Sequence, residues 1–307
     1  MADYSIWVLE YARAPDVPAF ILVNGREGRA CLPYSLTVLQ SAEHTVLVDT
    51  GYLDVGRAHE LAVADGITQW TDPVEVLASI GIAPADVDQI LLTHLHYDHV
   101  GGITSFPRAV AWVQARELSE WLWALGLPPK MYFLQDGTAM DHLQSLQRLA
   151  PQGRLRLVEG RQPEVLPGIT LEADPETHTF GHQHVVVRGS DGRAWVLPGD
   201  LLFAYDNLGG LDGAGPYLPN GFGTGSRREI IARMDAIMLA VDRQVDRVLP
   251  GHEEQLFAHH SSWVRPDGLR VAEVNLRPGD VSRRPTGAPE VPRARTRAAD
   301  GTLGSLT

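Results

Sequence analysis

Four side chains that could bind metal ions lie within six residues of one another: His94, His96, Asp98 and His99. They follow an apolar run at residues 87–92, which predicts a buried strand, and precede two glycines, which predict a loop leading into a helix. Side chains two residues apart point to the same side of an extended chain, so His94 and His96 could bind one cation together. Asp98 and His99 come where the chain turns, and they could face a second cation.

A structural role without metal is the alternative for this cluster, because a single histidine is usually a surface or hydrogen-bonded residue. Three histidines and an aspartate buried together without a partner would be strongly destabilising. We therefore expect a metal site.

The stretch from Thr93 to Gly102, Thr-His-Leu-His-Tyr-Asp-His-Val-Gly-Gly, resembles the signature of the metallo-β-lactamase superfamily. The resemblance implies an α/β fold of the four-layer αβ/βα sandwich type, with further ligands at later strand ends. These ligands are His178 in His-Thr-Phe-Gly-His, Asp200 in Pro-Gly-Asp and His252 in Leu-Pro-Gly-His. It places His94, His96 and His178 at one metal, Asp98, His99 and His252 at the other, and Asp200 between them.

Several residues near these ligands depart from the family pattern or have more than one possible role. Thr177 stands where the family usually has Gly, which predicts a different local turn, and His182 and His184 are expected to pack or hydrogen-bond and not to bind metal. Asp49 ends a predicted strand at residues 45–48. It either supports the ligands from behind, as in relatives of the superfamily, or makes an Asx-turn.

Strand and helix patterns alternate along the chain, which indicates an α/β layered domain. Asp72-Pro73-Val74-Glu75 has the cap, proline and glutamate of a helix start, and Ser226-Arg227-Arg228-Glu229 is a capping box for a helix through Leu239. We expect further strands at residues 5–9, 30–40, 109–114, 154–158, 168–173, 185–187, 195–197, 248–249 and 269–276, and a helix at 118–125. The hydrolase domain is predicted to span residues 1–284, and the Pro-, Ala-, Arg- and Gly-rich residues 285–307 are predicted to form a flexible tail.

The nitrogen and oxygen donors of this ligand set suit two Zn²⁺ ions, although Mn²⁺, Fe²⁺ or Co²⁺ would also be accepted. Two cations roughly 3.5–4 Å apart lower the pKa of a shared water toward about 7 and supply a bridging hydroxide that attacks a carbonyl or phosphoryl centre. Asp98 could also guide a proton to the leaving oxygen.

The order of the ligands and the sequence from Val113 to Glu117 are most similar to the N-acyl-homoserine lactonase branch, which implies lactone opening and a role in quorum quenching. In those lactonases a Tyr three residues after the bridging Asp assists the substrate carbonyl. Here that position is Phe203, and Tyr205 is the candidate catalytic substitute. The alternatives are another ester, an amide, an aryl compound or an organophosphate at the same site, or a binding protein without catalysis.

Composition limits the partners. The net charge is −12 and no basic cluster lies near the metal motif, which argues against nucleic acid and anionic membranes and favours a small-molecule substrate.

Residues 128–134 could form a pocket wall or lid, a core plug or a homodimer contact. The single Cys31 excludes a disulfide within the chain, and no apolar run is long enough to span a bilayer, so a cytoplasmic location is expected.

Overall fold

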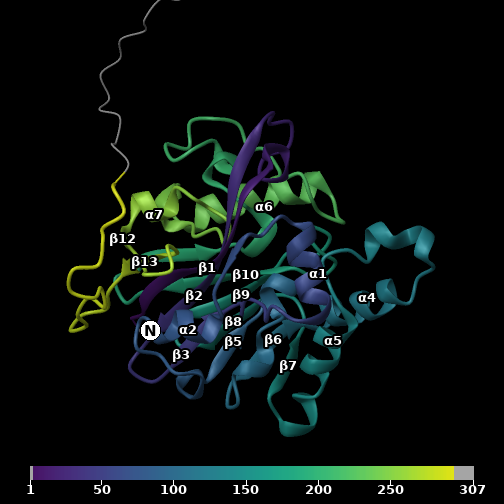
Figure 1. Cartoon of the computed structure of the whole chain (residues 1–307), viewed down its shortest axis with the longest axis horizontal. Helices are drawn as coiled ribbons and strands as arrows, with labels where there is room; N and C mark the ends of the chain where they lie inside the picture. The colour runs from purple at the N-terminus through teal and green to yellow at the C-terminus, as the bar shows by residue number, and fades with distance from the viewer. Residues whose placement is uncertain (1–2, 294–307) are drawn as a thin grey trace, which may run out of the picture.

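The computed structural model describes residues 3–293, which contain two β-sheets (Figure 1). The strand order in the large sheet is β12-β13-β1-β2-β3-β5-β6-β7, with β4 paired to β1, and the small sheet has the order β11-β10-β9-β8. The strands of the large sheet are β1 (Ser5–Pro18), β2 (Arg29–Gln40), β3 (Thr45–Val48), β4 (Gln69–Trp70), β5 (Gln89–Leu91), β6 (Val110–Gln114), β7 (Leu155–Val158), β12 (Ser261–Val264) and β13 (Arg270–Asn275). Those of the small sheet are β8 (Gln162–Leu166), β9 (Ile169–Ala173), β10 (Gln183–Arg188) and β11 (Ala194–Leu197).

Helices cover the outer faces of the two sheets (Figure 1). The helices on these faces are α1 (Gly56–Ala64), α2 (Pro73–Ala78), α4 (Ala115–Leu125), α5 (Met140–Gln147) and α6 (Arg227–Ala240). Helix α3 (Tyr97–Val100) is a single turn after β5, and α7 (Leu256–His259) contacts β12 and β13. Both predicted helix caps are present: Asp72 Oδ1 accepts from the N–H of Val74 at 2.8 Å, and Ser226 Oγ accepts from the N–H of Glu229 at 3.4 Å. No helix of the described residues is long and apolar enough to cross a membrane.

Two buried apolar clusters hold the layers together. Alternate side chains of β1 belong to different clusters, because successive residues of a strand face opposite sides. Trp7 and Leu9 pack in the cluster that reaches α1, α2, α4 and α5, whereas Ile6 and Val8 pack with the small sheet and α6. The order is therefore helix, sheet, sheet, helix, and the predicted four-layer α/β sandwich is confirmed.

The N-terminal hairpin is longer than the sequence pattern indicates. Strand β1 continues through the proline-bearing region to Pro18, and β2 pairs with it from Arg29 to Gln40. At the tip, the N–H of Asn24 donates to the carbonyl of Pro219 at 2.9 Å, and Phe20 packs edge-on against Phe222 at 5.9 Å. The hairpin thus lies against the loop that precedes α6, as the purple and green segments at the top of Figure 1 show.

Part of the segment predicted to be a tail contacts β12. The N–H of Val264 in β12 donates to the carbonyl of Pro289, and that of Val291 donates to the carbonyl of Ser262, both within 3.0 Å. Residues 289–291 therefore pair with β12, a strand that the sequence pattern did not indicate. The rest of the predicted tail, residues 294–307, lies outside the described residues.

Candidate metal centre

All seven predicted ligands come together at one end of the sheets, in two groups whose donor atoms lie within 4.8 Å of one another. The first group consists of His94, His96, His178 and Asp200. Nε2 of His178 lies 3.3 Å from Oδ2 of Asp200 and 3.1 Å from Nδ1 of His96, and Nε2 of His94 lies 3.8 Å from the same carboxylate oxygen. Two imidazoles thus lie near Oδ2 of Asp200, and the third, His96, contacts one of them.

The second group consists of Asp98, His99 and His252. Nε2 of His99 and Nε2 of His252 each lie 3.2 Å from Oδ1 of Asp200. Oδ2 of Asp98 lies 3.3 Å from His99 and 3.7 Å from His252. Asp200 therefore directs one oxygen toward each group, as a carboxylate that bridges two cations would.

The ligand loops follow strand ends. The first four ligands come directly after β5, where the chain turns into the single turn of α3. His178 lies between β9 and β10, and Asp200 follows β11. His252 follows a short parallel bridge between Val248 and Val196. Because these ends lie side by side, four distant segments meet at one point.

Burial sets the protonation of the first group. Burial holds the pKa of His94 and His178 well below the usual value and lowers that of His96 to about 4, so these imidazoles are neutral near pH 7. Burial would raise the pKa of Asp200, but His99 and His252 hold it well below its usual range. Neutral imidazoles and an ionised carboxylate are the forms that bind a metal.

The donor atoms fit divalent cations. Within residues 3–293, the buried atoms His94 Nε2, His99 Nε2 and Asp200 Oδ1 have no hydrogen-bond partner. Leaving such atoms unsatisfied is costly, and all three point into the space between the two groups. Imidazole and carboxylate donors in this arrangement suit Zn²⁺ and related divalent ions.

The second nitrogen of several ligand imidazoles is held by a neighbouring group, which fixes the ring orientation. Oδ2 of Asp49 lies 2.8 Å from Nδ1 of His99, and the same carboxylate accepts from the N–H and the hydroxyl of Thr93. Nδ1 of His252 donates to the carbonyl of Pro33 at 2.7 Å. Of the two roles considered for Asp49, these contacts show the supporting one.

Glu117 supports the ligand loops, and the sequence pattern did not single it out. It is fully buried at the start of α4, and its carboxylate joins the loop around His96 to the loop around His178. The donors are the N–H of Leu95, the indole N–H of Trp121, the hydroxyl of Thr179 and the N–H of Gly181. A charged residue one turn into an amphipathic helix gives no signal of its burial until the helix is placed.

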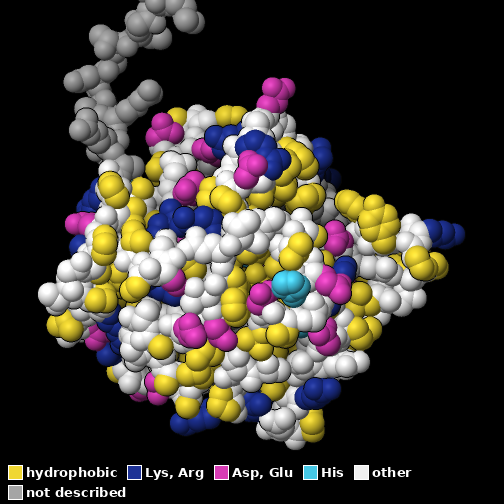
Figure 2. Space-filling model, in the orientation of Figure 1, with side chains coloured by type: hydrophobic (Ala, Val, Ile, Leu, Met, Phe, Trp, Pro, Cys, Tyr) yellow, Lys and Arg dark blue, Asp and Glu magenta, His cyan; other side chains and the backbone are white. Residues whose placement is uncertain are grey.

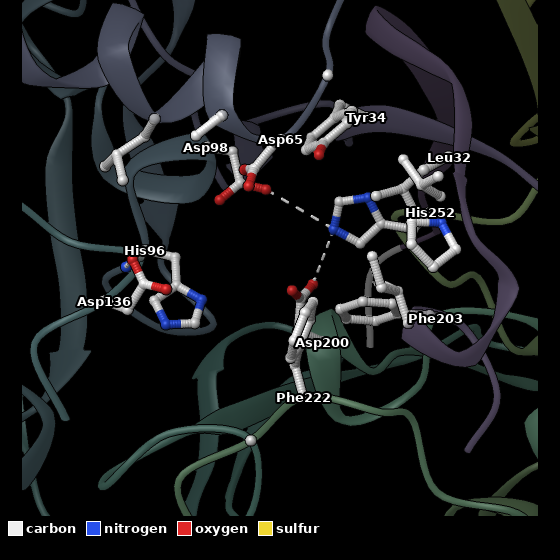
Figure 3. A pocket seen from close by; sticks show the side chains of 18 of the residues that line it. Leu32, Tyr34, Asp65, His96, Asp98, Asp136, Asp200, Phe203, Phe222 and His252 are labelled. Carbon is white, nitrogen blue, oxygen red and sulfur yellow. Dashed lines mark hydrogen bonds and ion pairs between the residues drawn. The ribbon is translucent and has the colours of Figure 1, made fainter. Parts of the chain in front are cut away.

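A cavity of about 550 Å³ opens above the metal centre (Figure 3). Its floor contains the ligands His96, Asp98, His178, Asp200 and His252. Its walls are largely apolar and come from the hairpin tip, α1, residues 129–134, the loop after β11 and the loop before α6. They include Val17, Phe20, Ile21, Leu32, Leu61, Phe133, Phe203 and Phe222. Its charged wall residues are acidic except for Arg29, which pairs with Asp16 at 2.7 Å. The shape and lining suit an uncharged, partly apolar small molecule.

The segment at residues 128–134 forms a 3₁₀ helix, η4 (Pro129–Leu134), that projects beside α4 (Figure 1). Phe133 lines the cavity, as the pocket-wall interpretation predicts, although its side chain remains 64% exposed. Tyr132 and Trp123 are also exposed, and Figure 2 shows hydrophobic side chains gathered on this projection. Lysine and arginine side chains are scattered over the same face of the molecule, with no continuous basic surface in this view (Figure 2).

Tyr205 is not brought to the cavity. Its side chain is fully buried in the core shared by the small sheet and α6, and its backbone N–H, not its hydroxyl, contacts Glu253. Tyr205 follows Phe203 by two residues. Its side chain lies on the inner side of the loop, whereas that of Phe203 lines the cavity. This placement does not support the predicted contact between Tyr205 and a substrate carbonyl.

His182 and His184 lie behind the centre. Nδ1 of His184 pairs with Oδ2 of the buried Asp174 at 2.6 Å, and His182 packs beside His94 with ring centroids 5.4 Å apart. Neither residue belongs to the two ligand groups.

Burial raises the pKa of Cys31 to about 11, so this thiol is a poor nucleophile near pH 7.

Comparison with known proteins agrees with this geometry. Residues 30–252 match the sequence model of the metallo-β-lactamase superfamily, so the chain belongs to that superfamily. A probable metallo-hydrolase of Mycobacterium tuberculosis is 33% identical over 263 residues, which cover 81% of this chain and 72% of the relative. An N-acyl homoserine lactonase of a Bacillus species is 27% identical over 188 residues, which cover 58% of this chain and 67% of the relative.

The fold is likewise similar to that of solved structures. A quorum-quenching N-acyl homoserine lactone lactonase superposes with a TM-score of 0.61 at 21% identity, over 83% of this chain and 94% of the other. Family, fold and the His/Asp cluster together define a metal-dependent hydrolase.

Proposed function

We propose that the protein is a dinuclear zinc hydrolase that opens a lactone ring or a similar cyclic ester. The observation that carries the proposal is the position of two complete ligand groups, joined by Asp200, at the floor of an apolar cavity. The similarity to N-acyl homoserine lactonases, which covers 58% of this chain, supports a lactone as the substrate.

Two bound divalent cations would supply a water of lowered pKa and a Lewis acid for the substrate carbonyl. The side chains of the protein set the geometry around them. Asp200 fixes the spacing of the two groups, and Asp49 and the Pro33 carbonyl hold the rings of His99 and His252. Asp98 contributes Oδ2 to its group, which leaves Oδ1 to carry a proton to the leaving oxygen as the acyl C–O bond breaks.

The cavity walls select the substrate. An acyl or alkyl chain would pack against Leu32, Phe133 and Phe222, which removes apolar surface from water. Asp65 and Asp136 at the wall would repel an anionic substrate. The substrate class that fits is therefore a neutral lactone with an apolar substituent.

The test is hydrolysis by the zinc-loaded protein of a panel containing acyl-homoserine lactones of several chain lengths, γ-lactones, aryl esters and paraoxon. We expect the highest kcat/KM for lactones with apolar chains, and loss of turnover in Asp200→Asn. A preference for aryl esters or paraoxon would assign the same centre to a different substrate. No turnover of any compound would favour a binding protein without catalysis.

A further inference from the structure

The cavity contains few groups that could donate a hydrogen bond to a substrate carbonyl. Among its wall residues within the described chain, Asp65 and Asp136 are acids, and Arg29 is paired with Asp16 at the exposed rim. The hydroxyl of Thr224 is directed at the carbonyl of His178, 3.5 Å away. Phe203, which packs 4.8 Å from His252 and 5.7 Å from His178, has no polar atom in its side chain. Tyr34 is the remaining wall residue, within the described chain, whose side chain has a neutral donor.

Tyr34 is fixed to the metal centre by its own strand. It lies in β2, paired with Ala12 of β1, and is only 3% exposed. The preceding residue, Pro33, accepts the Nδ1–H of His252 at 2.7 Å. The Tyr34 ring also packs edge-on against the His252 imidazole, with centroids 4.9 Å apart and planes at 86°. Strand β2 therefore positions the ligand and the tyrosine together.

The hydroxyl of Tyr34 is available to a ligand. Figure 3 shows it directed into the cavity, from the side that carries Asp98 and His252. A tyrosine hydroxyl ordinarily has a pKa of about 10. It therefore stays protonated at working pH, which is the form that donates.

We infer that the Tyr34 hydroxyl donates a hydrogen bond to the carbonyl oxygen of the substrate, next to the group formed by Asp98, His99 and His252. The inference rests on the proposed carbonyl hydrolysis. As the oxygen of water adds to the carbonyl carbon, negative charge develops on the carbonyl oxygen, and the Tyr34 O–H stabilises it without transferring its proton. The acyl C–O bond then breaks, and the products are a carboxylate, the proton that it releases and the freed hydroxyl of the former ring.

The test variant is Tyr34→Phe, with Tyr52→Phe as the matched control. Tyr52 is also buried, its hydroxyl has no hydrogen-bond partner among residues 3–293, and it packs on Tyr11 and Tyr97 away from the cavity lining. For the zinc-loaded protein we expect Tyr34→Phe to lower kcat about 10- to 100-fold, with KM changed less than about threefold, because a donor that acts on the developing charge contributes mainly to the transition state. Zinc content should be equal in all three proteins.

A second measurement does not depend on turnover. The infrared carbonyl stretch of a bound, isotope-labelled N-acyl γ-lactam, which resists hydrolysis, should lie at lower frequency in the wild type and in Tyr52→Phe than in Tyr34→Phe. Equal kcat and equal carbonyl frequency in wild type and Tyr34→Phe would overturn the inference. If the wild type hydrolyses no compound in the panel, the proposed function fails, and the lactam frequency still decides whether Tyr34 donates. A wild-type protein that neither turns over lactones nor binds the lactam would contradict both the proposed function and the role of Tyr34.

Discussion

The carboxylate of Asp49 lies 2.8 Å from Nδ1 of the His99 imidazole, on the side of the ring away from the other ligands. The chain reaches this position through a left-handed residue, since φ of Asp49 is 63°. The strained backbone and the contacts to Thr93 indicate that the carboxylate is placed to orient the ligand loop.

We therefore expect Asp49→Asn to lower the affinity for the second cation about 10- to 100-fold, because the ring of His99 loses its charged partner. Zinc titration against a competing chelator measures this change. Asp54→Asn is the control, since Asp54 makes a similar 2.8 Å contact with the surface histidine His59. Equal zinc affinities for the two variants would contradict the role of Asp49.

Glu117→Gln should lower both stability and zinc retention. An amide has one acceptor oxygen and would place an NH₂ against the donors that now contact the second carboxylate oxygen. Each unsatisfied buried group costs about 1–3 kcal/mol in the free energy of unfolding, measured by urea denaturation. Glu120→Gln, in the same helix but with a partly exposed side chain, should have little effect. A Glu117→Gln protein as stable as Glu120→Gln would argue against the bridging role.

Gly137→Ala should disturb the first metal group through direct contact. A Cβ at this position would lie 2.7 Å from the His96 ring, and φ is +83°. The Gly137 carbonyl also accepts from the N–H of Tyr97 at 2.7 Å, so backbone adjustment would move the ligand loop. We expect loss of about one zinc equivalent per chain by elemental analysis.

Gly153→Ala separates the steric effect from backbone strain. Gly153 has a similar φ of +69°, but no atom lies within 4 Å of the Cβ position. This variant should retain its zinc and lose only a little stability. Equal zinc loss in both variants would show that strain, and not the His96 contact, is responsible.

Because of His260, we expect the free energy of unfolding of the metal-free protein to fall as the pH is lowered. Burial, with the neighbouring His259, lowers the pKa of His260 to about 4, whereas an unfolded histidine titrates near 6.5. Between these values the unfolded chain binds more protons than the folded one, so stability falls as the pH drops from about 6.5 to about 4. His260→Phe should reduce this fall by on the order of 1 kcal/mol, measured by denaturation in chelator at pH 7 and pH 4.5. An unchanged difference would contradict the assigned shift.

Only part of the ligand set is marked by the local sequence. His94, His96, Asp98 and His99 follow one apolar strand, whereas the later ligands His178, Asp200 and His252 were assigned by resemblance to the metallo-β-lactamase superfamily. Apolar alternation likewise predicted most strands, and capping residues predicted the starts of α2 and α6. These features depend on neighbours in the sequence.

The residues that were missed depend on contacts between distant segments. Tyr34 and His252 are far apart in sequence and meet only because β2 runs beside the last ligand loop. Glu117 is buried only because α4 lies over two loops. Tyr205 has the expected residue type near Asp200, but the turn of its loop directs the side chain into the core. Residues 289–291 have a tail-like composition but pair with β12 through backbone hydrogen bonds.

The central claim is that the seven ligands hold two cations through a shared carboxylate. The most direct measurement is the zinc content per chain after loading and gel filtration, determined by elemental analysis for the wild type and Asp200→Asn. We expect about two equivalents in the wild type and less than about one in the variant, because Asp200 contributes an oxygen to each group. A fully loaded wild type that retains one equivalent or none, or a variant that retains two, would contradict the account.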